Sequence, residues 1–102
     1  MKYLDWDIEK NEWLIRERGI SFEEVLVAIE EGRILDIVPH PNQKQYPGQR
    51  MFVLHINEYA YVVPFVEDGE KLFLKTIIPS RKATKKYIKK SLQRDNEEIL
   101  LF

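Results

Sequence analysis

The stretch from Met51 to Ile78, MFVLHINEYAYVVPFVEDGEKLFLKTII, decides the fold. It contains three runs that are rich in β-branched and aromatic residues, at positions 51–56, 59–66 and 72–78. Asn57-Glu58 separates the first two runs, and the turn sequence EDGE separates the last two. Strands that are joined by connections this short are antiparallel neighbours. The stretch therefore predicts three consecutive antiparallel strands.

A fourth strand is predicted just before this stretch. The residues from Arg33 to Val38 have a period near 2, and Pro39-His40-Pro41 ends the run because proline cannot donate to a strand ladder. The polar connection that follows contains Pro47-Gly48, which suits the centre of a type II turn. Pro64 lies inside the 59–66 run, which predicts an edge position or a bulge there.

Two helices are predicted ahead of these strands. Asp7 can cap a helix over residues 8–18, and Gly19 supplies the left-handed position that ends it. Ser21 and Glu24 have the spacing of a capping box, and the apolar residues that follow recur at i, i+3, i+4 and i+7. The second helix is expected to close at Gly32.

A basic helix is predicted after the strands, over residues 81–94, with Ser80 as its cap. Residues 95–102 are acidic and then apolar, so this tail is expected either to fray or to lay Ile99, Leu100 and Phe102 on a groove or a partner. The chain thus reads as a single α+β domain over residues 1–102. Its predicted architecture is two N-terminal helices, a four-stranded antiparallel sheet and a basic C-terminal helix.

The composition excludes several classes of protein. With no Cys and only two His, disulfides and the common Cys/His zinc sites are excluded. No apolar run approaches the roughly 18 residues of a membrane-spanning helix, and the start MKYLDWDIEK does not match a secretory signal, so a cytoplasmic protein is expected. The motifs of nucleotide-cofactor sites, metallopeptidases and hydrolase elbows are missing, so no cofactor or metal is predicted.

Charge is distributed unevenly along the chain. Residues 1–70 hold 7 Lys/Arg against 14 Asp/Glu, whereas residues 71–94 hold 9 Lys/Arg and no acid. Such a cationic segment predicts a surface that faces a polyanion or an acidic partner. The alternative is a solvated helix face that acidic neighbours balance in the fold.

The two histidines are candidates for a general base and a general acid, since only imidazole titrates near neutral pH without perturbation. His40 lies between two prolines, and its alternative is an ordinary exposed loop residue. His55 alternates with Met51 and Val53 on one strand face, and its alternative is a partly buried histidine with a satisfied hydrogen bond.

Three cations near strand ends could bind a phosphodiester: Arg50, Lys75 and Arg81. Arginine forks grip phosphate oxygens, and a cation stabilises the charge that forms during in-line attack by a ribose 2′-hydroxyl. The alternative is that Arg50 and Arg81 pair with carboxylates from the acidic first half of the chain.

Further contacts to RNA are predicted from one loop and from the basic segment. Tyr46 in the loop could stack on a base, whereas Tyr59, Tyr61 and Tyr87 have core spacing and are expected to pack inside the fold. The lysines expected to contact RNA are Lys82, Lys85, Lys86 and Lys89.

Short motifs along the chain resemble the BrnT family of toxins. They are Trp6-Asp7, Lys10-Asn11, Gly19-Ile20-Ser21-Phe22-Glu23-Glu24, Ile77-Ile78, Ser80-Arg81-Lys82-Ala83-Thr84 and Tyr87, and the resemblance spans about residues 3–90. It implies a RelE-like ribonuclease fold, cleavage of RNA without a metal, and neutralisation by a co-encoded antitoxin. It also implies that operator DNA is contacted only through the antitoxin complex.

Two functional hypotheses follow. In the first, the chain is the toxin of a type II toxin-antitoxin pair and an RNA endonuclease: Arg81 and Arg50 hold the phosphate, Lys75 or Lys82 stabilises an oxygen, and His55 or His40 moves protons. In the second, it is a non-catalytic binding module with a toxin fold, which engages an acidic antitoxin-like partner or nucleic acid. The second hypothesis is motivated by Glu17-Arg18 and Pro79-Ser80, where the chain departs from the family pattern.

Overall fold

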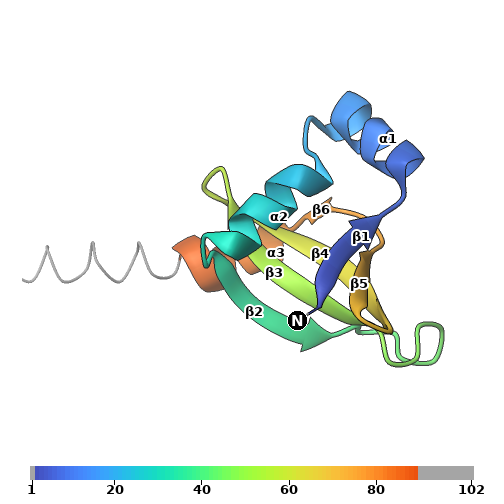
Figure 1. Ribbon diagram of the computed structural model, residues 1–102. Coiled ribbons are helices and arrows are strands. Elements are labelled where there is room, and N and C mark those ends of the chain that lie inside the picture. Colours follow the sequence, from blue (N-terminus) through green and yellow to red (C-terminus); the bar gives the residue numbers. More distant parts are fainter. Residues whose placement is uncertain (1, 90–102) are drawn as a thin grey trace, which may run out of the picture.

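The computed structural model describes residues 2–89. Its strands are β1 (Tyr3–Trp6), β2 (Ile34–Pro39), β3 (Arg50–Ile56), β4 (Tyr59–Asp68), β5 (Lys71–Leu74) and β6 (Ile78–Pro79). Its helices are α1 (Ile8–Arg18), α2 (Phe22–Glu30) and α3 (Arg81–Ala83), which continues as the π-helix η1 (Thr84–Lys89). Within these residues the fold is α+β, with one mixed sheet (Figure 1). None of the helices described is long and apolar enough to cross a membrane.

The predicted four-stranded antiparallel sheet is wrong. The strand order is β1-β5-β4-β3-β2, β6 pairs with β4, and β1 runs parallel to β5, while the other pairs are antiparallel. β1 has only four residues, and its partner lies far along the chain, with Leu4 opposite Leu72. No turn links the two strands, so short-range hairpin patterns cannot reveal the pair.

The predicted last strand, over residues 72–78, is split in two. β5 ends at Leu74 and β6 begins at Ile78, so Lys75, Thr76 and Ile77 lie between paired segments. This interruption falls beside Pro64, where β4 changes its neighbour from β5 to β6. Lys75 donates its backbone N–H to the Pro64 carbonyl at 2.8 Å. Because a strand residue turns its N–H and C=O to the same side, the missing N–H of Pro64 faces this interruption rather than β3.

A helical layer covers each face of the sheet (Figure 1). One face carries the first core, which joins helix residues to residues of β3 and β4: Leu14 of α1, Phe22 and Val25 of α2, and Phe52, Leu54, Val63 and Phe65. Trp6 of β1 also packs there, and its ring stacks on Phe22 at 5.6 Å between centroids. The other face carries a smaller, second core, which joins Ala83 and Ile88 to Val53 and Ala60. Residues that alternate along β3 and β4 therefore serve two different cores.

The end of the first helix at Gly19, the capping box of the second helix and the tight hairpin are confirmed, whereas the predicted capping by the Asp7 side chain is wrong. Ser21 and Glu24 form both hydrogen bonds of the capping box, and Gly19 ends α1 with a φ of 65°. Asp7 occupies the N-cap position of α1, although its side chain makes no capping hydrogen bond. Asn57 and Glu58 both have positive φ, as a two-residue type I′ hairpin turn requires.

The predicted basic helix over residues 81–94 is described as far as Lys89, and residues 90–94 and the tail 95–102 lie outside the described part of the chain. Ser80 is the N-cap, and its hydroxyl accepts from the Ala83 N–H at 3.1 Å. The α-helical hydrogen bonds cease after one turn, and a π-helix follows from Thr84.

Candidate functional site

A hollow of about 400 Å³ lies beside the interruption between β5 and β6. It is lined by His40, Tyr46, Gln49, Pro64, Lys75, Thr76 and Ile78. Pro64 alternates with Val63 and Phe65 of the first core, so the hollow opens on the opposite sheet face, which also carries α3 and η1. Three residues predicted from the sequence, His40, Tyr46 and Lys75, therefore line one space.

One wall of this His40–Lys75 hollow is the connection between β2 and β3. The N–H of His40 donates to the Gln49 carbonyl at 2.9 Å and closes the connection at its base. Inside it, the amide of Gln43 donates to the His40 carbonyl at 2.6 Å and accepts from the Gly48 N–H at 3.1 Å. The rings of His40 and Tyr46 lie 4.5 Å apart between centroids. The loop thus holds an imidazole and a phenol side by side.

The other wall is the segment that follows β5. The Lys75 side chain is exposed, and its Nζ lies 5.5 Å from the centre of the Phe73 ring. Within residues 2–89, no carboxylate forms an ion pair with Lys75. Its ammonium is therefore available to an anion that enters the hollow.

Gln49 is a site residue that the sequence analysis missed. The residue is 8% exposed and lines the hollow, and its side chain has no hydrogen-bond partner among the residues described. A single glutamine in a polar loop carries no pattern that predicts burial. Thr76, which also lines the hollow, was missed because the 72–78 run predicts a regular strand there.

The basic surface, defined as Arg81, Lys82, Lys85 and Lys86, lies on α3 and η1. All four side chains are exposed. Lys89, which was also predicted to contact RNA, ends η1. α3 and η1 pack on the second core, so the basic surface and the His40–Lys75 hollow share one face of the sheet.

Tyr87 fastens this basic segment to the edge strand β2. Its hydroxyl donates to Oδ2 of Asp36 at 2.6 Å, and Lys86 Nζ lies 5.2 Å from the centre of the Tyr87 ring. The hydrogen bond lowers the pKa of Asp36, because it stabilises the carboxylate, and raises the pKa of Tyr87. Tyr87 is therefore placed for docking of the helix, as its core spacing predicts.

The structure does not bring Arg50 to this face. Arg50 lies two residues before Phe52 and therefore on the strand face of the first core, and its guanidinium lies 5.2 Å from the centre of the Phe65 ring. It forms an ion pair with Glu67, and hydrogen bonds from Lys2, together with that ion pair, lower the pKa of Glu67. Arg50 and Arg81 consequently stand on opposite faces of the sheet and cannot hold the same phosphate.

The two histidines are also apart. His40 is hydrogen-bonded to Gln49, just before β3 begins, whereas His55 lies six residues further along and opposite Ala60. At 3.3 Å per strand residue this separation is roughly 20 Å. His40 and His55 therefore cannot serve as the acid and base of one reaction in this arrangement.

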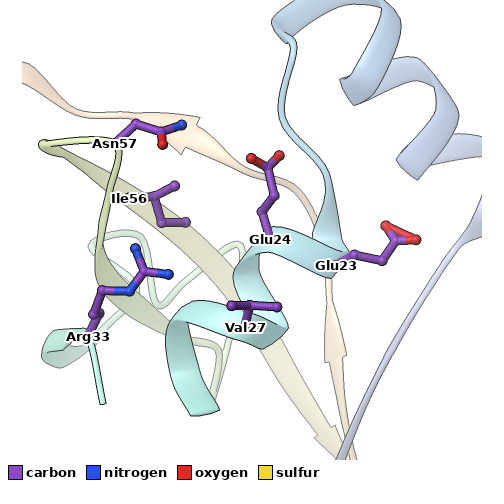
Figure 2. Close-up of a pocket in the computed structure, with 6 residues that line it drawn as sticks. All are labelled: Glu23, Glu24, Val27, Arg33, Ile56 and Asn57. Atoms are coloured by element: carbon purple, nitrogen blue, oxygen red, sulfur yellow. The ribbon is translucent and has the colours of Figure 1, made fainter. Parts of the chain in front are cut away.

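A second, smaller hollow of about 230 Å³ lies between α2 and the β3–β4 hairpin (Figure 2). Three of its polar side chains make hydrogen bonds within the fold, although Nε of Arg33 has no partner among the described residues. Glu24 accepts from the Ser21 N–H at 2.8 Å, Glu23 accepts from the Asn11 amide at 2.6 Å, and Arg33 donates to the His55 carbonyl at 3.3 Å. Figure 2 shows the two glutamates on the helix and Arg33 on the opposite side. This hollow contains none of the predicted site residues.

Within residues 2–89, no three His, Cys, Asp or Glu side chains gather closely enough to hold a metal ion. Comparison of the chain with family models, curated proteins and solved structures gives no match.

Proposed function

We propose that the chain is a BrnT-like toxin that cleaves RNA without a metal, and that RNA lies across the sheet face bearing the His40–Lys75 hollow and the basic surface. The observation that carries this proposal is the convergence of His40, Tyr46 and Lys75 on one hollow, from two separate parts of the chain. An imidazole, an aromatic ring and a free ammonium are the groups that proton transfer, base stacking and phosphate binding require.

In this proposal Lys75 and Arg81 neutralise the RNA backbone, and Lys75 stabilises the charge on the phosphate under attack. The 2′-hydroxyl of the ribose attacks phosphorus and loses its proton to solvent, and the bond to the 5′-oxygen breaks. The products are a 2′,3′-cyclic phosphate and a free 5′-hydroxyl. The departing oxygen needs a proton, which His40 supplies.

One hydrogen bond fixes the neutral form of His40. Its Nδ1 accepts from the Asn42 N–H at 3.0 Å, so the proton of the neutral imidazole resides on Nε2. A general acid must be the imidazolium, so His40 gives a proton to the departing oxygen only after Nδ1 is protonated and this bond is released. Arg50 has no part in this scheme, because it lies on the other face and pairs with Glu67.

The test compares wild type with His40→Ala, Lys75→Ala and the matched control Lys44→Ala. Lys44 is exposed in the same connection as His40 but does not line the hollow. Induced expression should arrest growth, and purified wild type should cut a labelled oligoribonucleotide. Loss of a general acid typically costs about 100-fold or more in rate, so His40→Ala and Lys75→Ala should each relieve the arrest while Lys44→Ala should not. Full activity in both hollow variants would refute the assignment.

The alternative function is a non-catalytic binding module for RNA or an acidic partner. It is favoured by the separation of His55 from His40 and of Arg50 from Arg81, which leaves a cationic face without a complete acid–base pair. RNA that is bound but left uncut by well-folded wild type would support this alternative. Co-expression with an adjacent short reading frame that relieves growth arrest would support a cognate antitoxin, and operator binding should then require the complex.

A further inference from the structure

Gln49 is the exception among the buried polar side chains of residues 2–89. Three such side chains are buried: Asn11, Gln49 and Thr84. Asn11 binds Glu23 and the Phe22 N–H, and Thr84 binds the Ala60 N–H and the Ser80 carbonyl. The amide of Gln49 has no such partner in the described part of the chain. Because nearly all buried polar side chains in native proteins are hydrogen-bonded, the unbonded side chain of this 8% exposed residue is a candidate for binding a ligand.

Gln49 is one of the residues that line the His40–Lys75 hollow. Among the described residues, the only fully enclosed side-chain atom without a hydrogen bond is Nε of Arg33, so the amide atoms of Gln49 keep some accessible surface. That space of about 400 Å³ lies within the range of small-ligand sites, roughly 300–1,000 Å³. The half-exposed Tyr46 and the exposed Lys75 line the same hollow.

We propose that this hollow is a base-binding subsite in which Gln49 recognises adenine, and this inference rests on the proposed function. The amide oxygen accepts from the adenine N6 amino group while the amide N–H donates to N7. The base stacks on the open side of Tyr46, and Lys75 contacts the adjoining phosphate. On this N7 edge guanine presents two acceptors, N7 and O6, so an amide bound there has no donor for its oxygen.

The experiment titrates 5′-AMP, GMP, CMP and UMP, and then the oligoribonucleotides UUAUU and UUGUU, into ¹⁵N-labelled protein. NMR spectra follow the side-chain amide signals of Gln49. Gln49→Met keeps the length of the side chain and removes its hydrogen bonds. The matched control is Gln45→Met, which changes an exposed glutamine of the same connection that does not line the hollow.

AMP should shift the Gln49 amide signals and bind more tightly than GMP by about 5- to 150-fold, the range expected for one bidentate pair. UUAUU should bind more tightly than UUGUU and than AMP. Gln49→Met should abolish the preference for adenine with an otherwise native spectrum, and Gln45→Met should retain it. Equal binding of the four nucleotides, a preference for another base, or a preference that survives Gln49→Met would overturn the inference. Tighter binding of AMP than of UUAUU would overturn its assignment to RNA.

Cleavage of the same oligoribonucleotides separates the two proposals. RNA cleavage without a Gln49-dependent preference for adenine would refute the base-binding subsite but would still support the proposed function. A Gln49-dependent preference without cleavage would support the subsite and refute the catalytic proposal.

Discussion

Replacement of Thr84 by valine should weaken the attachment of the basic helix to the sheet. Thr84 is 2% exposed, and its hydroxyl accepts from the Ala60 N–H at 2.9 Å and donates to the Ser80 carbonyl at 2.7 Å. The Ser80 N–H in turn donates to the Ala60 carbonyl at 2.9 Å. The backbone of β4 at Ala60 is therefore completed by the helix start rather than by another strand. Valine has nearly the same shape as threonine but can make neither hydroxyl bond.

The expected loss of stability can be worked out from these contacts. Valine leaves the buried Ala60 N–H without a partner, which costs about 1–3 kcal/mol. The Ser80 carbonyl keeps a bond from the Thr84 backbone N–H at 3.0 Å, so its loss is small. The buried methyl group that replaces the hydroxyl returns up to about 0.8 kcal/mol. The net loss in the free energy of unfolding should be about 1–2 kcal/mol.

Urea unfolding followed by circular dichroism measures this loss. With a slope of about 1–2 kcal/mol per molar for a small domain, the midpoint of the Thr84→Val variant should fall by about 1 M. Thr84→Ser is the control, because it keeps the hydroxyl and removes only a methyl group. Hydrogen exchange separates the loss of the hydroxyl bond from the loss of a methyl group: the Ala60 amide should exchange faster in Thr84→Val but remain protected in Thr84→Ser. An Ala60 amide that stays protected in the valine variant would refute the reasoning.

Three further predictions concern the pH dependence, the first helix and the basic surface. Folding lowers the pKa of Asp36 and raises the pKa of Tyr87. The extra stability of wild type over Tyr87→Phe should therefore be fully present between pH 3.8 and pH 10.0, the ordinary pKa values of the two groups. This extra stability should vanish as the pH falls through the lowered pKa of Asp36 or rises through the raised pKa of Tyr87. Urea unfolding of both proteins across pH measures it, and a difference that stays constant would contradict the prediction. Gly19→Ala should lower the free energy of unfolding in urea by about 1 kcal/mol, since alanine is strained at a φ of 65° although its Cβ meets no atom within 4 Å. Equal stability of the two proteins would disprove the strain. The double variant Lys85→Ala/Lys86→Ala removes two cations that are proposed to bind phosphates. The slope of log affinity for single-stranded RNA against log salt should become shallower by about 1.4. An unchanged slope would mean that neither lysine contacts RNA.

The parts of the fold that depend on neighbouring residues could be predicted from the sequence. The capping box at Ser21, the left-handed end at Gly19 and the turn at Asn57-Glu58 each use side chains or backbone conformations within a few residues. β1 could not be predicted in the same way, because its register with β5 depends on the packing of Trp6 against Phe22. Alternation of Leu4 and Trp6 was the one local signal, and four residues are too few to make it distinctive.

The candidate site shows the same division. His40, Tyr46 and Lys75 were identified by their residue types, but the sequence contains no information that is local to all three. They meet because the connection between β2 and β3 closes on itself and because the strand after β4 breaks opposite Pro64. Pro64 predicted an edge position or a bulge in its own strand, but β4 lies inside the sheet and pairs with β3 without a register shift, and the interruption falls in the neighbouring segment between β5 and β6. The burial of Gln49 depends on the whole loop and had no local sign.

The motif Ser80-Arg81-Lys82-Ala83-Thr84 is divided between structure and function. Ser80 caps α3, Ala83 packs in the second core, and Thr84 completes the hydrogen bonding of β4. Those three residues would be required by any protein that docks a basic helix on this sheet, whether or not it cuts RNA. Arg81 and Lys82 are exposed and make no hydrogen bond or ion pair through their side chains within residues 2–89. Substitution of Arg81 and Lys82 therefore tests the proposed RNA cleavage without disturbing the contacts that dock the helix.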